Sequence, residues 1–515
     1  MTLYKKLTHP KFLDPLHASR QYVPRDIVDK AMTKDNIEAQ LGKKGRTCMK
    51  FRSSPAEKIV TRNAKNLLAV LVFCKKAGDV EDLLEHGFTD EDLPLISTKD
   101  DLPLPSTKDS FKSTDEASET MEHDFELRSA GDPKKKWRPP EEWDEQDVDC
   151  FLQMQWMFLA PVFDVSGTHR QILRDCPLPF SDFTEIMSHN TVVVYKAKVN
   201  SSHQQGFEKE APNLHIALKE FKISKEFKKE QDNMEKIRGL QRYKHITQSL
   251  ATFEQGDPKR YYIILPFAEG GDLTDFWRTK DIKSRTPALT LWSLKQMLGL
   301  ADALQGLHKH IDIGANCRHG DLKPGNILHF ITDGQPEGIL KISDFGISRI
   351  HINETFQREG KPTTTRATTP SYEAPEASPI LNLKQERSRR YDLWSMGCIY
   401  LEFVIWLVED WEAVQSFTKA RESDGNREML FYQIDGTTAK VHQQVLDKMS
   451  CLRKHPQCSP GTALGELLDM IERSLLVVDV ECRVDSTYLY NRLTKVVRQA
   501  EALPRYLVGE GQSMG

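Results

Sequence analysis

The sequence lacks the features that mark secreted, membrane-spanning and zinc-binding proteins. Its N-terminus has no apolar core of the kind that signal peptides carry. Its longest apolar stretch, residues 393–408, contains Ser395 and Glu402 and is shorter than a bilayer span, so we expect a buried core helix there. Nine cysteines, an odd number, are scattered without CxxC or Cys/His ligand spacing, which indicates reduced thiols and not a disulfide framework or a zinc site. We therefore expect a cytoplasmic chain without a membrane span.

A strong charge of either sign is also missing. The formal net charge is −4 with histidine neutral, so no basic field recruits nucleic acid, and we expect no direct nucleic-acid partner. One basic cluster, Pro133–Arg138, is interpreted as a solvated linker segment, with a nuclear import signal as its alternative. A chain of 515 residues, of which 28% are charged, has room for two or three domains with linker between them.

The N-terminal part of the chain has a helical texture. Residues 1–23 are polar, and we expect them to be a flexible lead-in. Apolar residues are dense at 63–74 and recur at 80–87, where a glycine ends the pattern, so residues 24–91 are expected to form a small α-helical module. This module is interpreted either as a regulatory module that binds a protein partner or as a structural extension.

A segment of turn-forming residues follows the helical module. The nine residues 92–100 are repeated at 101–109, and a run rich in Ser, Thr and Glu comes next. Two short, proline-containing copies cannot build a solenoid, so residues 92–140 are expected to be a low-complexity linker. An apolar pattern then resumes, and residues 141–178 are expected to form a helical extension that packs on the following domain.

The rest of the chain changes from strand-like to helical. Residues 191–199, 214–221 and 261–266 are rich in β-branched and aromatic residues, and the texture is mostly helical after Leu289. This order predicts a two-lobed α+β domain at residues 179–503, with a flexible tail at 504–515.

Four short motifs occur in this domain in a fixed order. They are Ala217–Lys219 within a strand, His319–Asn326, Asp344–Gly346 and Ala374–Glu376. The set resembles the VAIK, HRDLKxxN, DFG and APE signatures of eukaryotic-type protein kinases. One such motif alone is weak evidence, but four in order are specific. The resemblance implies a bilobal kinase fold, with a small β-rich lobe followed by a larger α-helical lobe.

The resemblance assigns a role to a lysine in the small lobe and to a glutamate on the helix after it. Lys219 would hold the α- and β-phosphates of ATP, and a carboxylate on that helix would fix the lysine. Glu230 is the preferred partner. Glu235 is the competitor, but it would break the apolar register formed by Met234 and Ile237.

Four polar residues of the larger lobe complete the implied chemistry. Asp321 would accept the proton of the substrate hydroxyl, and Lys323 would lie over the γ-phosphate. Asn326 and Asp344 would hold two Mg²⁺ ions, which makes Mg²⁺ the implied cofactor and ATP and a protein substrate the implied partners. Each residue alone is more often a solvated surface group, so only their shared order favours the chemical role.

The resemblance also implies an adenine site and a set of structural residues. The adenine would contact the gatekeeper Leu265, the backbone N–H of Ala268, and the side chains of Val194, Ala217 and Leu328, all of which could also be plain core residues. Asp392 would cap the backbone of the catalytic loop, and Arg483 would pair with Glu376. The structural set is His319, Phe345, Gly346, Glu376, Asp392 and Arg483.

Substrate class and likeness to particular kinases rest on shorter stretches. Lys323, two residues after the catalytic aspartate, and Thr369, before residues 370–372, resemble serine/threonine kinases more than tyrosine kinases. Residues 89–95 and 265–273 further resemble kinase-domain proteins of filamentous fungi.

The sequence departs from the kinase pattern at two places that bear on activity. The glycines of the family's glycine-rich loop fall on Met187, His189 and Val192, whose side chains should loosen or reshape the lid over ATP. Gly320 replaces the arginine that pairs with a phosphorylated activation loop, so residues 344–376 should depend less on phosphorylation. An active, non-RD serine/threonine kinase is the preferred hypothesis. A pseudokinase that binds nucleotide or acts as a scaffold is the alternative.

Two insertions relative to the family pattern remove no implied catalytic group. Residues 200–213 lengthen the turn before the Lys219 strand, and residues 332–338 lengthen a hairpin before Asp344.

Overall fold

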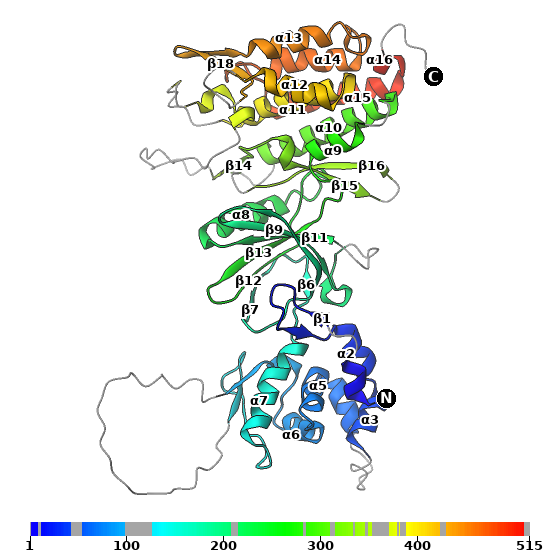
Figure 1. Ribbon diagram of the computed structural model, residues 1–515, viewed down its shortest axis with the longest axis vertical. Helices are drawn as coiled ribbons and strands as arrows, with labels where there is room; N and C mark the ends of the chain where they lie inside the picture. Colours follow the sequence, from blue (N-terminus) through cyan, green and yellow to red (C-terminus); the bar gives the residue numbers. More distant parts are fainter. Residues whose placement is uncertain are drawn as a thin grey trace, which may run out of the picture. The chain divides into compact units, whose positions relative to one another are not determined.

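The computed structural model (Figure 1) describes most of the chain. The described residues are 2–8, 12–42, 54–97, 126–207, 215–281, 285–309, 315–332, 335–345, 349–352, 370–378, 381, 388–422 and 429–508. The chain divides into two compact units, one formed by Met1–Lys222 and Leu250–Tyr262 and the other by Ile223–Ser249 and Ile263–Gly515. Together the units contain the strand-rich and helix-rich parts that the α+β kinase fold requires.

The first unit begins with a helical module built around one apolar helix. α5 (Lys65–Phe73) buries every residue from Leu67 to Val72, and α6 and α7 lie beside it (Figure 1). A helix that is apolar all round needs cover on several sides, which explains why short helices surround it. These helices are α1 (Leu3–Leu7), α2 (Arg25–Ala31), α3 (Lys34–Leu41), α4 (Pro55–Thr61), α6 (Val80–Glu85) and α7 (Glu145–Met154), with the short turns η2 (Ala77–Asp79), η3 (Asp90–Asp92) and η5 (Gln155–Phe158).

The structure corrects the expectation that residues 1–23 are flexible. In the described part of this segment, α1 buries Leu3 and Leu7 in the core of the helical module. β1 (Phe12–Leu13) and β2 (Gln21–Tyr22) pair in antiparallel fashion. The buried carboxylate of Asp14 accepts hydrogen bonds from the backbone N–H groups of Leu16 and Leu178. The segment is therefore anchored at several points.

The expectation of a linker at residues 92–140 is wrong at both of its described ends. β3 (Leu95–Ser97), β4 (Leu127–Ser129) and β5 (Lys136–Trp137) form a three-stranded antiparallel sheet, which packs on the helical module. The basic cluster joins this sheet, because Trp137 is buried and Lys135 Nζ lies 2.7 Å from Asp92 Oδ2. Residues 98–125, which hold most of the repeated sequence, lie outside the described residues.

The expected helical extension at residues 141–178 exists only in part. Val148 and Phe151 of α7 belong to the core of the N-terminal module, so the expectation that this helix packs on the following domain is wrong. The rest of the segment contains two short strands, β6 (Phe163–Asp164) and β7 (His169–Ile172). Both strands pair with residues of the following domain, so the boundary of that domain lies before residue 179.

A six-stranded sheet follows the helical module, in the order β7-β12-β13-β11-β9-β8. The predicted strands appear as β9 (Val192–Val199), β11 (His215–Phe221) and β13 (Arg260–Pro266), and β8 (Phe180–Ser188) and β12 (Ala251–Gln255) complete the sheet with β7. β7 runs parallel to β12 at the edge. The insertion at residues 200–213 adds η6 (Ser201–His203) and β10 (Gln204–Gln205), and β10 pairs in parallel with β6.

The second unit is mainly helical. Its helices are α8 (Ser224–Arg238), α9 (Leu273–Lys280), α10 (Pro287–Lys309), α11 (Arg390–Val408), α12 (Trp411–Ala420), α13 (Gln443–Leu452), α14 (Ala463–Met470), α15 (Ser486–Ala502) and α16 (Arg505–Val508). Its hairpins and ladders are formed by β14 (Ala315–Arg318) with β17 (Arg349–Ile352), β15 (Ile327–Thr332) with β16 (Gln335–Ile342), and β18 (Tyr432–Asp435) with β19 (Thr438–Val441). Short turns are η7 (Pro324–Asn326), η8 (Pro370–Tyr372), η9 (Pro375–Ala377), η11 (Pro456–Cys458) and η12 (Ile471–Leu475).

α11 is the central helix of this unit. It is buried from Tyr391 to Leu407, which confirms the buried helix expected from the longest apolar stretch. Length and composition alone would let it cross a membrane, but its surface is covered by the unit's own core. The expected flexible tail at 504–515 is wrong where it is described, because α16 packs Tyr506 and Leu507 into the same core.

Candidate active site

The loop His319–Asn326 connects β14 to β15, and a side chain from the first turn of α11 anchors it. The carboxylate of Asp392, fully buried, accepts hydrogen bonds from the backbone N–H groups of His319 and Gly320, each at 2.9 Å. His308 Nε2 lies 2.9 Å from Asp392 Oδ2. Burial opposes ionisation of this carboxylate, but the hydrogen bond and charge of His308 outweigh it and hold the pKa of Asp392 below its ordinary value. One ionised side chain thus fixes the loop backbone.

Asp321 is oriented by two neighbours on the same loop. Lys323 Nζ lies 3.0 Å from Asp321 Oδ2. The Asn326 amide nitrogen donates to the same carboxylate oxygen at 3.1 Å and to the Asp321 backbone carbonyl at 2.7 Å. The loop therefore gathers a carboxylate, an ammonium group and an amide within hydrogen-bond distance, which gives the carboxylate a fixed direction.

The start of the Asp344–Gly346 motif is attached to this loop. Ser343 donates its N–H to the Asn326 carbonyl at 2.9 Å, and His319 Nε2 lies 2.9 Å from the Ser343 carbonyl oxygen. Phe345 is buried with its ring centroid 5.3 Å from that of His319. Asp344, between them, is exposed and has φ of 59°, a left-handed conformation that costs a non-glycine residue on the order of 1 kcal/mol or more.

The helix α8 separates the two candidate glutamates by burial. Glu230 lies on the buried face with Phe227, Met234 and Ile237, and only 2% of it is exposed. Glu235 lies on the exposed face. Asn233, on the same buried face, donates its side-chain amide to the Phe345 carbonyl at 2.7 Å. This bond connects α8 to the segment after β16 that carries Asp344.

The ion pair that the resemblance implies between Arg483 and Glu376 is formed. Arg483 reaches Glu376 with both terminal nitrogens, at 2.7 and 3.0 Å, and both side chains are buried. Arg483 also donates to the backbone carbonyls of Val477 and Arg390. A paired, buried guanidinium that bonds several carbonyls fixes the segment after the activation loop against α11.

Three site residues predicted from the sequence belong to the first unit. Lys219 stands opposite Val194 in the β11–β9 ladder, and Ala217 stands opposite Lys196. Lys219 Nζ lies 5.3 Å from the centroid of the Phe221 ring. Val194 is buried and Ala217 half-buried, so alternate residues of these strands face a partly covered side of the sheet.

The hairpin between β8 and β9 contains the three positions at which the family has glycine. Met187 is 46% exposed near the end of β8, and Val192 begins β9. His189 is exposed and donates its N–H to the Val192 carbonyl at 2.8 Å, which closes the turn. The β8–β9 ladder shifts register between Ser181 and Thr184 and again between Glu185 and Met187, so this hairpin is irregular and has side chains at all three positions.

The end of β13, the segment after it and β15 carry the predicted adenine residues of the second unit. Leu265 is half-buried and Ala268 is buried. Leu328 is half-buried on β15 and forms a bridge with Asp272, and Gly270 donates its N–H to the His329 carbonyl at 3.0 Å. These backbone bonds bring the segment that follows Ala268 beside the strand that carries Leu328.

Some predicted positions lie outside the described residues. These are Gly346 of the Asp344–Gly346 motif and Thr369. One positioning residue, His308, was missed by the sequence reasoning. It lies in the last turn of α10 next to Lys309, and nothing in the local sequence distinguishes it from the nearby His310.

The donor set suits Mg²⁺ accompanied by a nucleotide. The exposed Asp344 carboxylate and the side-chain oxygen of Asn326, whose amide nitrogen is already used, are the hard oxygen ligands that Mg²⁺ prefers. Mg²⁺ usually takes only one or two protein ligands and completes its shell with phosphate oxygens and water. Two protein oxygens on neighbouring segments therefore fit this cofactor.

Comparison with known proteins agrees with these features. A family model described as the protein kinase domain matches residues 201–473, more than half of the chain. The serine/threonine-protein kinase tousled-like 1-B of Danio rerio is 31% identical over 147 residues, which are 28% of this chain and 18% of that protein. The serine/threonine-protein kinase Nek2 of Homo sapiens is 33% identical over 141 residues, 27% of this chain and 28% of that protein.

A third relative extends the match slightly. The serine/threonine-protein kinase ULK3 of Homo sapiens is 34% identical over 169 residues, 33% of this chain and 30% of that protein. The chain thus spans less than a third of the length of each of these relatives. The order of the motifs, the loop anchored by Asp392 and the family match lead to one conclusion: the chain belongs to the protein kinase domain family.

Proposed function

We propose that this protein transfers the γ-phosphoryl group of ATP to serine or threonine hydroxyls of a protein substrate. The observation that carries the proposal is the loop in which Lys323 and Asn326 both contact the Asp321 carboxylate, at 3.0 and 3.1 Å. Phosphoryl transfer depends on positioning and charge neutralisation more than on covalent chemistry, and this loop supplies both.

Each residue of the loop has a distinct role in the proposal. Asp321 accepts the proton of the attacking hydroxyl, and the Asn326 amide keeps its carboxylate turned toward that proton. Lys323, 26% exposed, moves from the carboxylate to the γ-phosphoryl oxygens as negative charge develops there. The serine/threonine preference is supported by the lysine at position 323 and by the relatives, which are serine/threonine-protein kinases.

The remaining charged groups bind the nucleotide in this proposal. Lys219 holds the α- and β-phosphates, and Glu230, buried on α8, fixes that lysine. Asn326 and Asp344 hold Mg²⁺, which neutralises the phosphate charge when it is bound. Val194, Ala217, Leu265 and Leu328 contact the adenine, and the Ala268 N–H donates to it.

The proposal includes a non-RD kinase with a substituted lid. Gly320 has no side chain to pair with a phosphorylated activation loop, so activity should not require phosphorylation there. The β8–β9 hairpin carries exposed Met187 and His189 side chains where the family has glycine, and a backbone hydrogen bond from His189 to Val192 closes its turn. Such a lid should bind ATP more weakly, which raises KM for ATP more than it lowers kcat.

Purified protein incubated with radiolabelled ATP, Mg²⁺ and casein tests the proposal. Wild type should incorporate label, and Asp344→Ala and Asp321→Asn should reduce the rate by at least about a hundredfold. Asp435→Asn makes the same chemical change as Asp321→Asn, but on the exposed β18–β19 hairpin, and should leave the rate unchanged. Equal label in all four proteins would reveal a contaminating kinase and contradict the assignment.

A thermal-shift measurement beside the label-transfer assay distinguishes the active kinase from the pseudokinase alternative, which the missing lid glycines favour. A thermal shift with Mg²⁺ and ATP in wild type, without label transfer to casein or to the protein itself, would support a nucleotide-binding scaffold. Loss of that thermal shift in Asp344→Ala would then show that the predicted metal ligands are used for binding only.

A further inference from the structure

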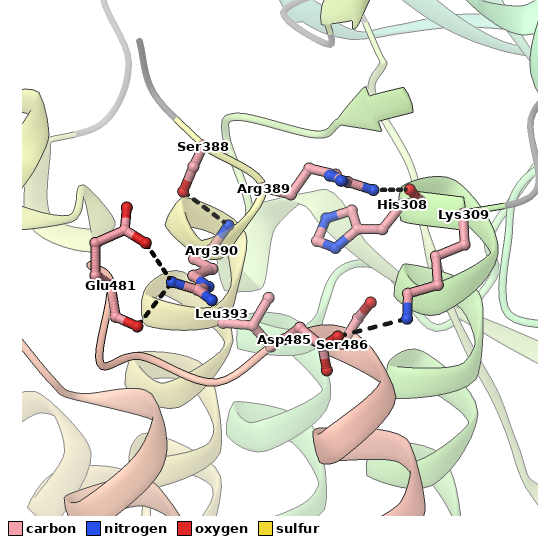
Figure 2. A pocket seen from close by; sticks show the side chains of 9 residues that line it. All are labelled: His308, Lys309, Ser388, Arg389, Arg390, Leu393, Glu481, Asp485 and Ser486. Carbon is pink, nitrogen blue, oxygen red and sulfur yellow. Dashed lines mark hydrogen bonds and ion pairs between the residues drawn. The ribbon is translucent and has the colours of Figure 1, made fainter. Parts of the chain in front are cut away.

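The second unit contains a pocket that shares His308 with the anchor of the catalytic loop but includes none of the residues assigned to phosphoryl transfer. It lies where the C-terminal end of α10, the N-terminal end of α11 and the N-terminal end of α15 meet (Figure 2). Its volume is about 330 Å³, which falls at the lower end of the roughly 300–1,000 Å³ of small-ligand pockets. The pocket therefore has room for a small group such as a phosphate and a part of its carrier.

The charged side chains around the pocket are mainly basic. Lys309, Arg389 and Arg390 contribute three positive charges, against the carboxylates of Glu481 and Asp485. Leu393 is the one aliphatic side chain among the residues that line it. The excess of positive charge among these side chains favours an anion over a neutral or cationic ligand.

The acidic neighbours hold these cations only loosely. Lys309 Nζ lies 3.4 Å from Asp485 Oδ2, and Arg390 lies 3.0 Å from Glu481. The two carboxylate side chains are 52% and 77% exposed, so both ion pairs are screened by solvent and contribute little to stability. A dianion that enters the pocket can replace either carboxylate as the partner of its cation, and little stability is lost.

A buried hydroxyl at the pocket wall supplies an independent sign of a ligand. Ser486 is 1% exposed, and its hydroxyl has no hydrogen-bond partner within the described part of the chain. Its side chain points from the start of α15 toward the pocket, between Lys309 and Leu393 (Figure 2). A buried hydroxyl without a partner costs on the order of 1–3 kcal/mol, so a ligand that accepts its proton recovers part of that cost.

Two long helices begin beside the pocket. Ser486 is the first residue of α15, a helix of 17 residues whose N-cap side chain, Asp485, accepts from the Tyr488 N–H. α11 begins at Arg390, whose N–H donates to the Ser388 hydroxyl at 3.2 Å, and the next two N–H groups donate to the carbonyls of Ser388 and Arg389. The first N–H groups of α11 are therefore already used, but the positive ends of both helix dipoles favour an anion over a cation between them.

We propose that this pocket binds a phosphate group, with Lys309, Arg389 and Arg390 as its cationic ligands and the Ser486 hydroxyl as a neutral donor. The group is either inorganic phosphate or the phosphate of a phosphorylated side chain, since both present the same tetrahedral dianion. Binding at this site does not depend on phosphoryl transfer by the kinase.

Isothermal titration calorimetry of the full chain at pH 7.5 tests the site, with inorganic phosphate and O-phospho-L-serine as probes and potassium chloride matched for ionic strength. Wild type should bind one phosphate group. Lys309→Met should weaken it about tenfold, and Ser486→Ala about threefold. Lys295→Met is the matched control, because Lys295 also lies on α10 and forms a surface ion pair, 2.7 Å from Glu501, but does not line the pocket.

The outcomes separate the two sources and the failure of the proposal. Tighter binding of O-phospho-L-serine identifies a phosphorylated side chain, and equal or tighter binding of inorganic phosphate identifies the free ion. Ser486→Ala should not lower the melting temperature without ligand, because it removes an unsatisfied buried hydroxyl. Absence of phosphate binding in wild type, or equal affinity in all four proteins, overturns the proposal.

Discussion

Replacement of Asp392 by asparagine should destabilise the second unit more than the replacement of Asp321 or Asp344 by asparagine. Asp392 is fully buried, and its two oxygens accept from two backbone N–H groups and contact His308, each at 2.9 Å. Asparagine keeps the shape but turns one acceptor into a donor that faces another donor. Breaking a buried, charge-assisted cluster in this way costs about 3–5 kcal/mol.

Urea unfolding followed by tryptophan fluorescence measures this cost. The control is Asp435→Asn, since Asp435 is largely exposed and lies 3.6 Å from Lys440 in a surface ion pair. That pair should contribute less than about 1 kcal/mol. If Asp392→Asn shifts the midpoint no more than Asp435→Asn does, the carboxylate does not hold the loop, and the geometric basis of the candidate active site fails.

The pH dependence gives the same prediction an independent check. The pKa of Asp392 is below its ordinary value of 3.8 in the folded protein, so the stabilisation is complete above that value and is lost as pH falls through the lowered folded pKa. Wild type should therefore lose stability in this acid range, and Asp392→Asn should lose less. Parallel acid curves for the two proteins would contradict the lowered pKa.

Three further changes test other parts of the fold. Burial raises the pKa of Asp90 to about 6, so stability falls by about 2–3 kcal/mol as pH rises from 4 through 6, and Asp90→Asn should flatten the curve of melting temperature against pH. Arg483→Lys breaks a two-point buried pair and should cost about 3 kcal/mol in urea unfolding. Gly465→Ala puts a Cβ 2.2 Å from a backbone carbonyl oxygen and should cost about 2 kcal/mol or more, whereas Gly78→Ala, with open space around it, should change stability by less than about 0.5 kcal/mol.

The parts of the fold that the sequence predicted are those specified by short-range patterns. The apolar residues at 67–72 are dense enough to predict a helix that is buried on all sides, and α5 is such a helix. β9 and β11 were predicted as strands from their β-branched and aromatic residues, and in β11 half-buried and buried residues alternate from His215 to Glu220. The catalytic loop was found because Asp321 and Asn326 are five residues apart in a motif that tolerates little variation.

The parts that were missed depend on contacts between distant segments. β3 and β4 are three residues each and are separated by about 29 residues, so neither has enough length to show a period. Trp137 was the available signal, because a tryptophan within a polar, basic segment seldom remains in solvent. β6 and β7 are stabilised by parallel pairing with β10 and β12, partners that no local pattern indicates.

Gly320 shows how a sequence difference that looks like a loss can have a conformational cause. The sequence marks it as a missing arginine, but the backbone there has φ of 82°, and its N–H donates to Asp392 at 2.9 Å. A side chain in this left-handed conformation costs roughly 1–2 kcal/mol, which glycine avoids. The substitution therefore removes a charge from the loop and strain from its anchored turn together. Asp392 anchors the backbone of His319 and Gly320, and Ser343 bonds the side chain of His319 and the carbonyl of Asn326. We therefore expect the order of this loop to depend little on phosphorylation of residues 344–376.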